Sequence, residues 1–135
     1  MKDKIKNYIK NLCKISLVII LNPETIPRFK EEIKRVAEQL GMKVYLRAEG
    51  FAFAKNNKVI ILGLPHPRLR VLDDKVSVWV RAPYKFNEKL IKSAGLSPDE
   101  YYNEIITLAN SIRDIFIKYK DKAKIIFIQI PENIP

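Results

Sequence analysis

Cysteine is nearly absent from this sequence, with Cys13 the only one among 135 residues. A single cysteine excludes an intramolecular disulfide and a cysteine-rich metal site, and it is typical of proteins in a reducing compartment. We therefore expect a cytoplasmic protein. Histidine is equally rare. Because His66 stands alone between two prolines, neither a zinc site nor a nucleophile paired with a histidine base is predicted.

Glycine is also scarce. The four glycines fall in no G-x-G-x-x-G or G-x-x-x-x-G-K pattern, so the phosphate loops of nucleotide-cofactor enzymes are missing. The apolar run Ile15–Leu21 is too short to cross a bilayer and is typical of a buried strand. We expect no cofactor, no bound metal and no membrane partner.

Acidic residues are outnumbered by basic ones. The chain has 25 Lys and Arg against 15 Asp and Glu, a formal net charge of +10, which makes polyanions the first candidate partners. Basic and acidic residues number nine and five over 1–40, eleven and four over 41–92, and five and six over 93–135, giving +4, +7 and −1. The middle segment therefore holds most of the excess. A composition rich in lysine and isoleucine is also typical of thermophilic proteins, in which such charges serve stability.

Hydrophobic periodicity predicts one α+β domain over residues 1–135. Apolar residues recur at helical spacing in four segments and follow strand patterns elsewhere. The predicted helices cover residues 3–13, 26–40, 87–94 and 98–118; the predicted strands are 15–21 and 125–130, with a β-meander over 42–82. Thr25 and Ser97 are predicted helix N-caps. We expect a mixed, mostly antiparallel sheet of about six strands with helices packed on one face, entered by a β-α-β unit.

Two tight hairpins are predicted within the meander. If the first turns at Asn56-Asn57, Phe53 lies opposite Ile60 and Phe51 lies opposite Leu62. The second is predicted to turn at Asp73-Asp74. Its register assigns these side chains to the core face: Leu69, Val71, Val76, Val78 and Val80.

The opposite face of the second hairpin is predicted to be basic with an aromatic residue within it. Its candidate binding residues are Arg68, Arg70, Lys75, Trp79 and Arg81, extended from the preceding strand by Lys43, Tyr45 and Arg47. Guanidinium and ammonium groups pair with phosphates, and exposed rings stack on unpaired bases. The pattern predicts a small, non-catalytic nucleic-acid-binding protein, with single-stranded nucleic acid as the favoured partner.

Three other interpretations stay open. Arg68 is predicted to lie directly opposite Trp79, and a cation–π pair worth about 0.5–1 kcal/mol explains both residues without a ligand. Arginine and aromatic residues also anchor protein interfaces, so the same face suits an assembly subunit or a homo-oligomer. A metal-dependent nuclease comes third, because Asp73 and Asp74 fit a turn better than a metal site.

Residues 89–105 resemble the core of a helix-turn-helix, with an Ala-Gly-Leu-Ser turn between two short helices. The second helix opens with Asp99, Glu100 and Glu104, which would repel the phosphates that a recognition helix must approach. The segment therefore favours an ordinary capped helix pair.

We predict that the domain folds without metal or disulfide, because its apolar residues supply a core and its one cysteine cannot form an intramolecular bridge. A thermal melt followed by circular dichroism should show the same cooperative transition with and without EDTA plus reductant. Loss of cooperativity in EDTA plus reductant would refute this expectation.

Overall fold

The computed structural model describes residues 2–47, 50–66 and 74–132. Six strands form one sheet in the order β2-β3-β4-β5-β1-β6, and each described pair of neighbours is antiparallel. The strands are β1 (Ser16–Leu21), β2 (Lys43–Arg47), β3 (Gly50–Lys55), β4 (Lys58–Leu64), β5 (Val76–Arg81) and β6 (Ala123–Gln129). The helices are α1 (Lys2–Leu12), α2 (Ile26–Gln39), α3 (Glu88–Ser93) and α4 (Pro98–Lys118), with 3-10 turns η1 (Pro23–Thr25) and η2 (Lys120–Lys122).

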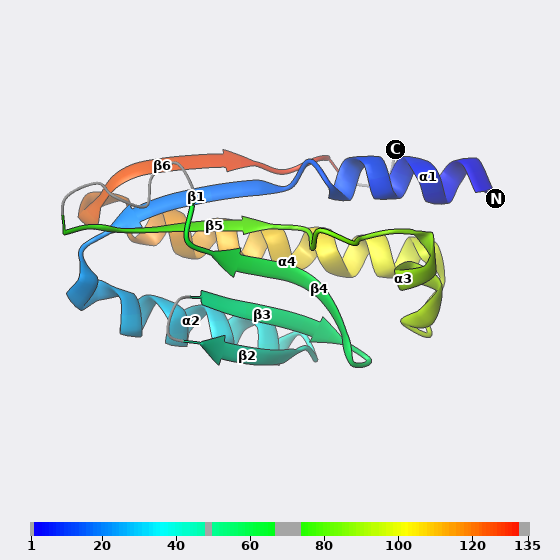
Figure 1. Cartoon of the computed structure of the whole chain (residues 1–135), viewed down its shortest axis with the longest axis horizontal. Helices are drawn as coiled ribbons and strands as arrows, with labels where there is room; N and C mark the ends of the chain where they lie inside the picture. The colour runs from blue at the N-terminus through cyan, green and yellow to red at the C-terminus, as the bar shows by residue number, and fades with distance from the viewer. Residues whose placement is uncertain (1, 48–49, 67–73, 133–135) are drawn as a thin grey trace.

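The helices form a layer against one side of the sheet. Figure 1 shows α2 and α4 behind the strands, and α1 and α3 pack against α4 at one end of the molecule. The aromatic side chain of Phe29 on α2 joins the two main helices, because its ring centroid lies 5.5 Å from those of both Phe116 and Tyr119. This architecture confirms the predicted α+β class, in which a mostly antiparallel sheet of about six strands carries helices on one face. Within the described ranges, no helix has the length and apolar character needed to span a membrane.

The unit β1-α2-β2 begins the sheet, but its two strands are not neighbours. Strands β5, β4 and β3 lie between them in the sheet order. The short connection after β2 makes it the antiparallel neighbour of β3, with which it pairs from Lys43 to Arg47, and β2 lies at the edge of the sheet. The strands β2, β3, β4 and β5 follow one another as antiparallel neighbours from this edge inward, and β5 then pairs with β1.

Helix starts follow the predicted capping residues at Ser97 but not at Thr25. The Ser97 side chain accepts a hydrogen bond from the Glu100 amide at 3.2 Å, and Pro98 occupies the first turn of α4. Thr25 makes no side-chain cap. The chain enters α2 through the 3-10 turn η1, which already holds Thr25 in a helical conformation, whereas a side-chain cap needs an extended one.

The first hairpin turns where predicted, but its register differs beyond the turn. Asn56 and Asn57 both have positive φ, 49° and 67°, as a two-residue turn with left-handed central residues requires. A β-bulge after the Ala54–Val59 pair then shifts the ladder by one residue. As a result, Phe53 lies opposite Ile61 instead of Ile60, and Phe51 lies opposite Gly63 instead of Leu62.

Gly63 accommodates the Phe51 ring in the shifted register. A Cβ atom placed on Gly63 would lie inside the van der Waals surface of the Phe51 ring. Phe51 and Phe53 are both buried, with ring centroids 5.3 Å apart. The glycine therefore leaves the space that the first of these rings fills.

The second hairpin is described only in part. Its predicted first arm, with Arg68, Arg70 and Asp73, lies outside the described residues. The described arm, β5, is flanked by two other strands, and the cross-strand neighbours of Trp79 are Leu64 on β4 and Val18 on β1. Both cross-strand positions beside Trp79 are therefore occupied by β4 and β1, and the predicted pairing with Arg68 lies outside the described residues.

We expect Gly63→Ala to destabilise the fold by about 1–3 kcal/mol, because the added methyl group must displace the Phe51 ring. Urea unfolding measures the change. The double variant with Phe51→Leu should lose less stability than the sum of the two single changes, since the shorter side chain relieves the clash. Additive effects would contradict the proposed packing.

Candidate functional site

The face of the sheet that points away from α2 and α4 is the open face. On β5, Val78 and Val80 are buried in the core, so the alternating side chains of Trp79 and Arg81 point the other way. Cross-strand pairing places two rows beside them on this face. The first row contains Tyr45, Ala52, Leu62, Arg81, Ser16 and Gln129; the second contains Leu64, Trp79, Val18 and Phe127.

The strands carry positive charge only. Their sequences contain no aspartate or glutamate. Their basic residues are Lys43, Arg47, Lys55, Lys58, Arg81 and Lys124. An anion that approaches the open face therefore meets no carboxylate from any of these strands.

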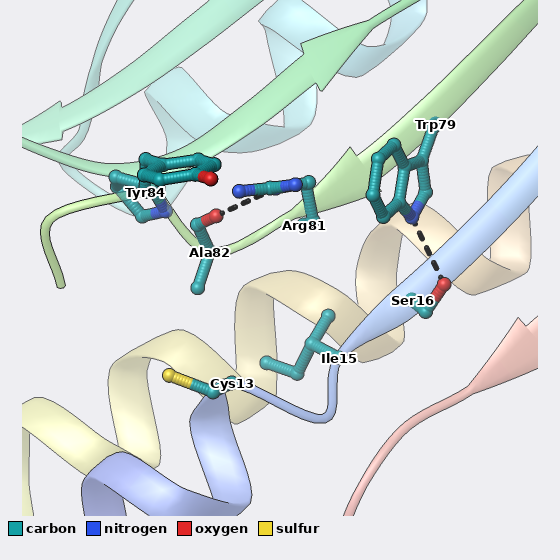
Figure 2. Close-up of a pocket in the computed structure, with 8 residues that line it drawn as sticks. Cys13, Ile15, Ser16, Trp79, Arg81, Ala82 and Tyr84 are labelled. Carbon is teal, nitrogen blue, oxygen red and sulfur yellow. Dashed lines mark hydrogen bonds between the residues drawn. The ribbon is translucent and has the colours of Figure 1, made fainter. Parts of the chain in front are cut away.

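The guanidinium of Arg81 is held between two aromatic rings at the end of β5. Its central carbon lies 4.6 Å from the centroid of the Trp79 ring and 5.4 Å from that of Tyr84. Its Nε donates to the carbonyl oxygen of Ala82 at 3.1 Å. Figure 2 shows the guanidinium between the two rings. Among the described residues, no carboxylate lies within ion-pair distance of Arg81.

A pocket of about 310 Å³ lies beside this stack, where α1 turns into β1. The Nε1 of Trp79 donates to the Ser16 Oγ at 3.0 Å, which leaves the Ser16 hydroxyl proton free to donate elsewhere. Cys13 also lines the pocket and is a free, exposed thiol. Partial burial raises the pKa of the Cys13 thiol, and the positive charge of Arg81 offsets part of that rise.

A second basic cluster lies on the edge strand β2. The Lys43 ammonium is 5.2 Å from the centroid of the Tyr45 ring, and the backbone carbonyl of Arg47 accepts a hydrogen bond from Lys30. Strands β3 and β4 separate this cluster from Arg81. Three strand spacings of about 4.8 Å put the two groups roughly 14 Å apart.

The eight candidate residues of the sequence thus separate into distinct places. Trp79 and Arg81 lie together, and Lys43, Tyr45 and Arg47 form the edge cluster. Lys75 lies just before the other end of β5, where its ammonium contacts Asn22 and lies 3.8 Å from the Asp74 carboxylate. Arg68 and Arg70 fall outside the described residues. Among the described residues, Arg81 forms a cation–π contact with Trp79.

Several site residues were missed by the sequence analysis. Tyr84 lies in the turn after β5 and is 90% exposed. The available sequence signal was an aromatic residue directly after Pro83, close to the end of the strand. Ser16 and Phe127 had no local signal, because pairing of distant strands brings them to the open face. The ring of His66 lies 5.2 Å from that of Trp79, so this loop histidine adjoins the site.

Neither metal-site geometry nor similarity to known proteins adds to this description. In the described part of the chain, no three His, Cys, Asp or Glu side chains gather closely enough to hold a metal ion. No protein-family model, curated protein or solved structure matches the sequence or the fold.

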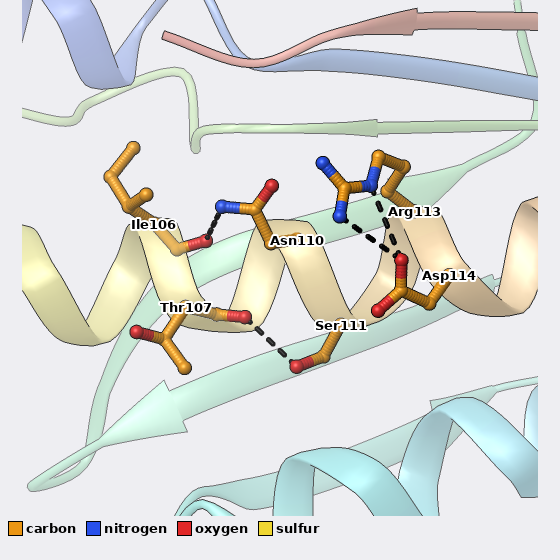
Figure 3. Close-up of polar contacts among 6 residues, drawn as sticks. All are labelled: Ile106, Thr107, Asn110, Ser111, Arg113 and Asp114. Carbon is orange, nitrogen blue, oxygen red and sulfur yellow. Dashed lines mark hydrogen bonds and ion pairs between the residues drawn. The ribbon is translucent and has the colours of Figure 1, made fainter. Parts of the chain in front are cut away.

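We predict that the Cys13 thiol titrates above the ordinary thiol range and that Arg81→Gln moves its pKa further upward, because the variant removes a nearby positive charge that favours the thiolate. The rate of alkylation by iodoacetamide across pH measures the pKa. Arg113→Gln is the matched control, since Arg113 pairs with Asp114 on α4 (Figure 3). An unchanged pKa in Arg81→Gln would show that Arg81 exerts no field at Cys13.

Proposed function

We propose that this protein binds single-stranded nucleic acid, without catalysis, through the open face of its sheet. The observation that carries the proposal is the Arg81 guanidinium, held between the rings of Trp79 and Tyr84 on a face whose strands contain no Asp or Glu. Among the described residues this guanidinium has no carboxylate partner. The phosphates of a nucleic acid provide an anionic partner for Arg81, and unpaired bases stack on exposed rings.

The arrangement of the two clusters suits an extended strand that crosses the sheet. Between them the first row of the open face has a small side chain, Ala52, and a half-buried one, Leu62. A nucleic-acid backbone that crosses the sheet over Ala52 and Leu62 meets Lys43 and Tyr45 at one end and Arg81 and Trp79 at the other. Binding of this kind is salt-sensitive and weakly selective for sequence, because phosphate contacts and stacking dominate it. The free thiol of Cys13 supports placement of the protein in the cytoplasm.

A protein interface is the second candidate, favoured by the apolar row on the same face. Leu64 and Phe127 are 39% and 50% exposed and lie in the row of Trp79. Exposed apolar side chains around an aromatic anchor are typical of assembly surfaces. Two copies joined through this face would bring like charges together in a chain of net charge +10, which disfavours the homo-oligomer relative to a polyanion partner.

We expect a single-stranded oligonucleotide to quench the fluorescence of Trp79, the only tryptophan, at low salt. About 0.5 M salt should reverse the quench, because counterion release drives phosphate binding. By anisotropy of a labelled oligonucleotide, Trp79→Ala should weaken binding by about 1–3 kcal/mol. Arg81→Ala should lower the slope of affinity against salt by about one phosphate contact.

Two controls separate the candidates. Arg113→Ala removes a basic residue from α4 and should leave affinity nearly unchanged. Phe127→Ser tests the apolar row by light scattering, since an assembly interface loses its oligomer in this variant. A fluorescence spectrum unmoved by oligonucleotide, together with a stable oligomer dispersed by Phe127→Ser, would overturn nucleic-acid binding and support the interface.

A further inference from the structure

The pocket beside the aromatic stack presents hydrogen-bond donors and no acid. Its polar side chains include the Arg81 guanidinium and the Ser16 hydroxyl, and none of its lining residues is Asp or Glu. Ser16 and Arg81 are direct cross-strand partners, so both groups project from the same face at one level of the sheet. A cavity of this composition suits an oxyanion.

Arg81 is oriented before any ligand arrives. The bond from Nε to the Ala82 carbonyl orients one edge of the guanidinium, and the Trp79 and Tyr84 rings lie on either side of it. Its terminal nitrogens have no hydrogen-bond acceptor among the described residues. A planar fork held in this way forms two parallel bonds to a phosphate, and little side-chain entropy remains to be lost on binding.

Ser16 is oriented in the same manner. Its Oγ accepts from the Trp79 indole, which directs one oxygen lone pair to the ring nitrogen and leaves the hydroxyl proton as a donor. The indole therefore has two roles, as a cation–π partner of Arg81 and as the donor that orients the Ser16 hydroxyl.

The shape of the pocket favours the end of a nucleic-acid strand over an internal segment of one. Cys13 and Ile15 bound it on one side, and the segment from Ala82 to Tyr84 bounds it on the other (Figure 2). Its volume of about 310 Å³ is at the lower limit for small-molecule sites, which start near roughly 300 Å³. A phosphomonoester has three free oxygens and about −1.5 to −2 charge, compared with one charge for a backbone phosphate.

We propose that this pocket is a phosphomonoester subsite, in which Arg81 and Ser16 bind the terminal phosphate of a strand that lies on the open face. The inference rests on the proposed function for the source of the phosphate. A free nucleotide offers the same chemistry and is the second source that the experiment distinguishes. Tyr84, which is 90% exposed at the pocket, is placed to stack on the adjoining base.

The test compares oligonucleotides of one sequence with a 5′-phosphate, with a 3′-phosphate and with neither, together with AMP and inorganic phosphate alone. Trp79 fluorescence and protection of Cys13 from iodoacetamide provide two readouts inside the pocket. One of the two terminal phosphates should raise affinity about tenfold or more, the range expected for charge-assisted hydrogen bonds, and the same oligonucleotide should protect Cys13.

Variants assign the effect to the named residues. Arg81→Lys keeps the charge but loses the planar fork, and Ser16→Ala removes the hydroxyl, so each should reduce the gain from the terminal phosphate. Arg113→Lys and Ser111→Ala are the matched controls, because Arg113 pairs with Asp114, and the Ser111 hydroxyl donates to the Thr107 carbonyl of its own helix at 2.9 Å (Figure 3). Both controls should keep the full gain.

The outcomes separate this inference from the proposed function. Equal binding of all three oligonucleotides with Trp79 quenching would overturn the subsite and leave the proposed function standing. Protection of Cys13 by AMP without any oligonucleotide binding would support the subsite with a free nucleotide as its source and overturn the proposed function. No response to any of these ligands would overturn both.

Discussion

The site depends on one constraint, the pairing of β5 along both of its edges. In its ladders with β4 and β1, Val78 and Val80 face the helices, and the alternation of side chains points Trp79 to the open face. A slip of one residue would turn Trp79 and Arg81 toward the core and expose two valines. The cost of burying an unpaired guanidinium opposes that slip, so the charge also helps to define the register.

Cationic side chains on the two faces of the sheet have different kinds of partner. Lys55 on β3 forms an ion pair of 2.9 Å with Glu104 of α4, with both side chains partly buried. Arg81 has aromatic rings in place of an acid. A cation–π contact at an exposed site contributes about 0.5–1 kcal/mol, whereas a hydrogen bond to a charged group contributes about 1.5–3 kcal/mol. The rings therefore hold the guanidinium in position and leave it able to gain from an anion.

Local signals predicted the secondary structure well. The Ser97 cap, the Asn56-Asn57 turn and the apolar stripe of α4 are each set by residues close together in the chain, and each is present in the structure. The register of the first hairpin was predicted wrongly because a register counted from the turn assumes a ladder without a bulge. The bulge allows the Phe51 ring to pack over Gly63, which is twelve residues further along the chain than Phe51.

The sequence by itself determined the fold class, the surplus of positive charge in the middle segment, and the alternation that sets Trp79 and Arg81 opposite the valines of β5. Those properties follow from composition and from a period of two residues, which any stretch of chain carries on its own. Only the tertiary structure decided the neighbours. Pairing of β1 with β5 brought Ser16 beside Arg81, and it placed Cys13 and Ile15 across the pocket from Ala82. Pairing between distant segments is chosen by the packing of the whole core, so the meeting of residues 13–16 with residues 79–84 at the pocket has no signature in either stretch alone.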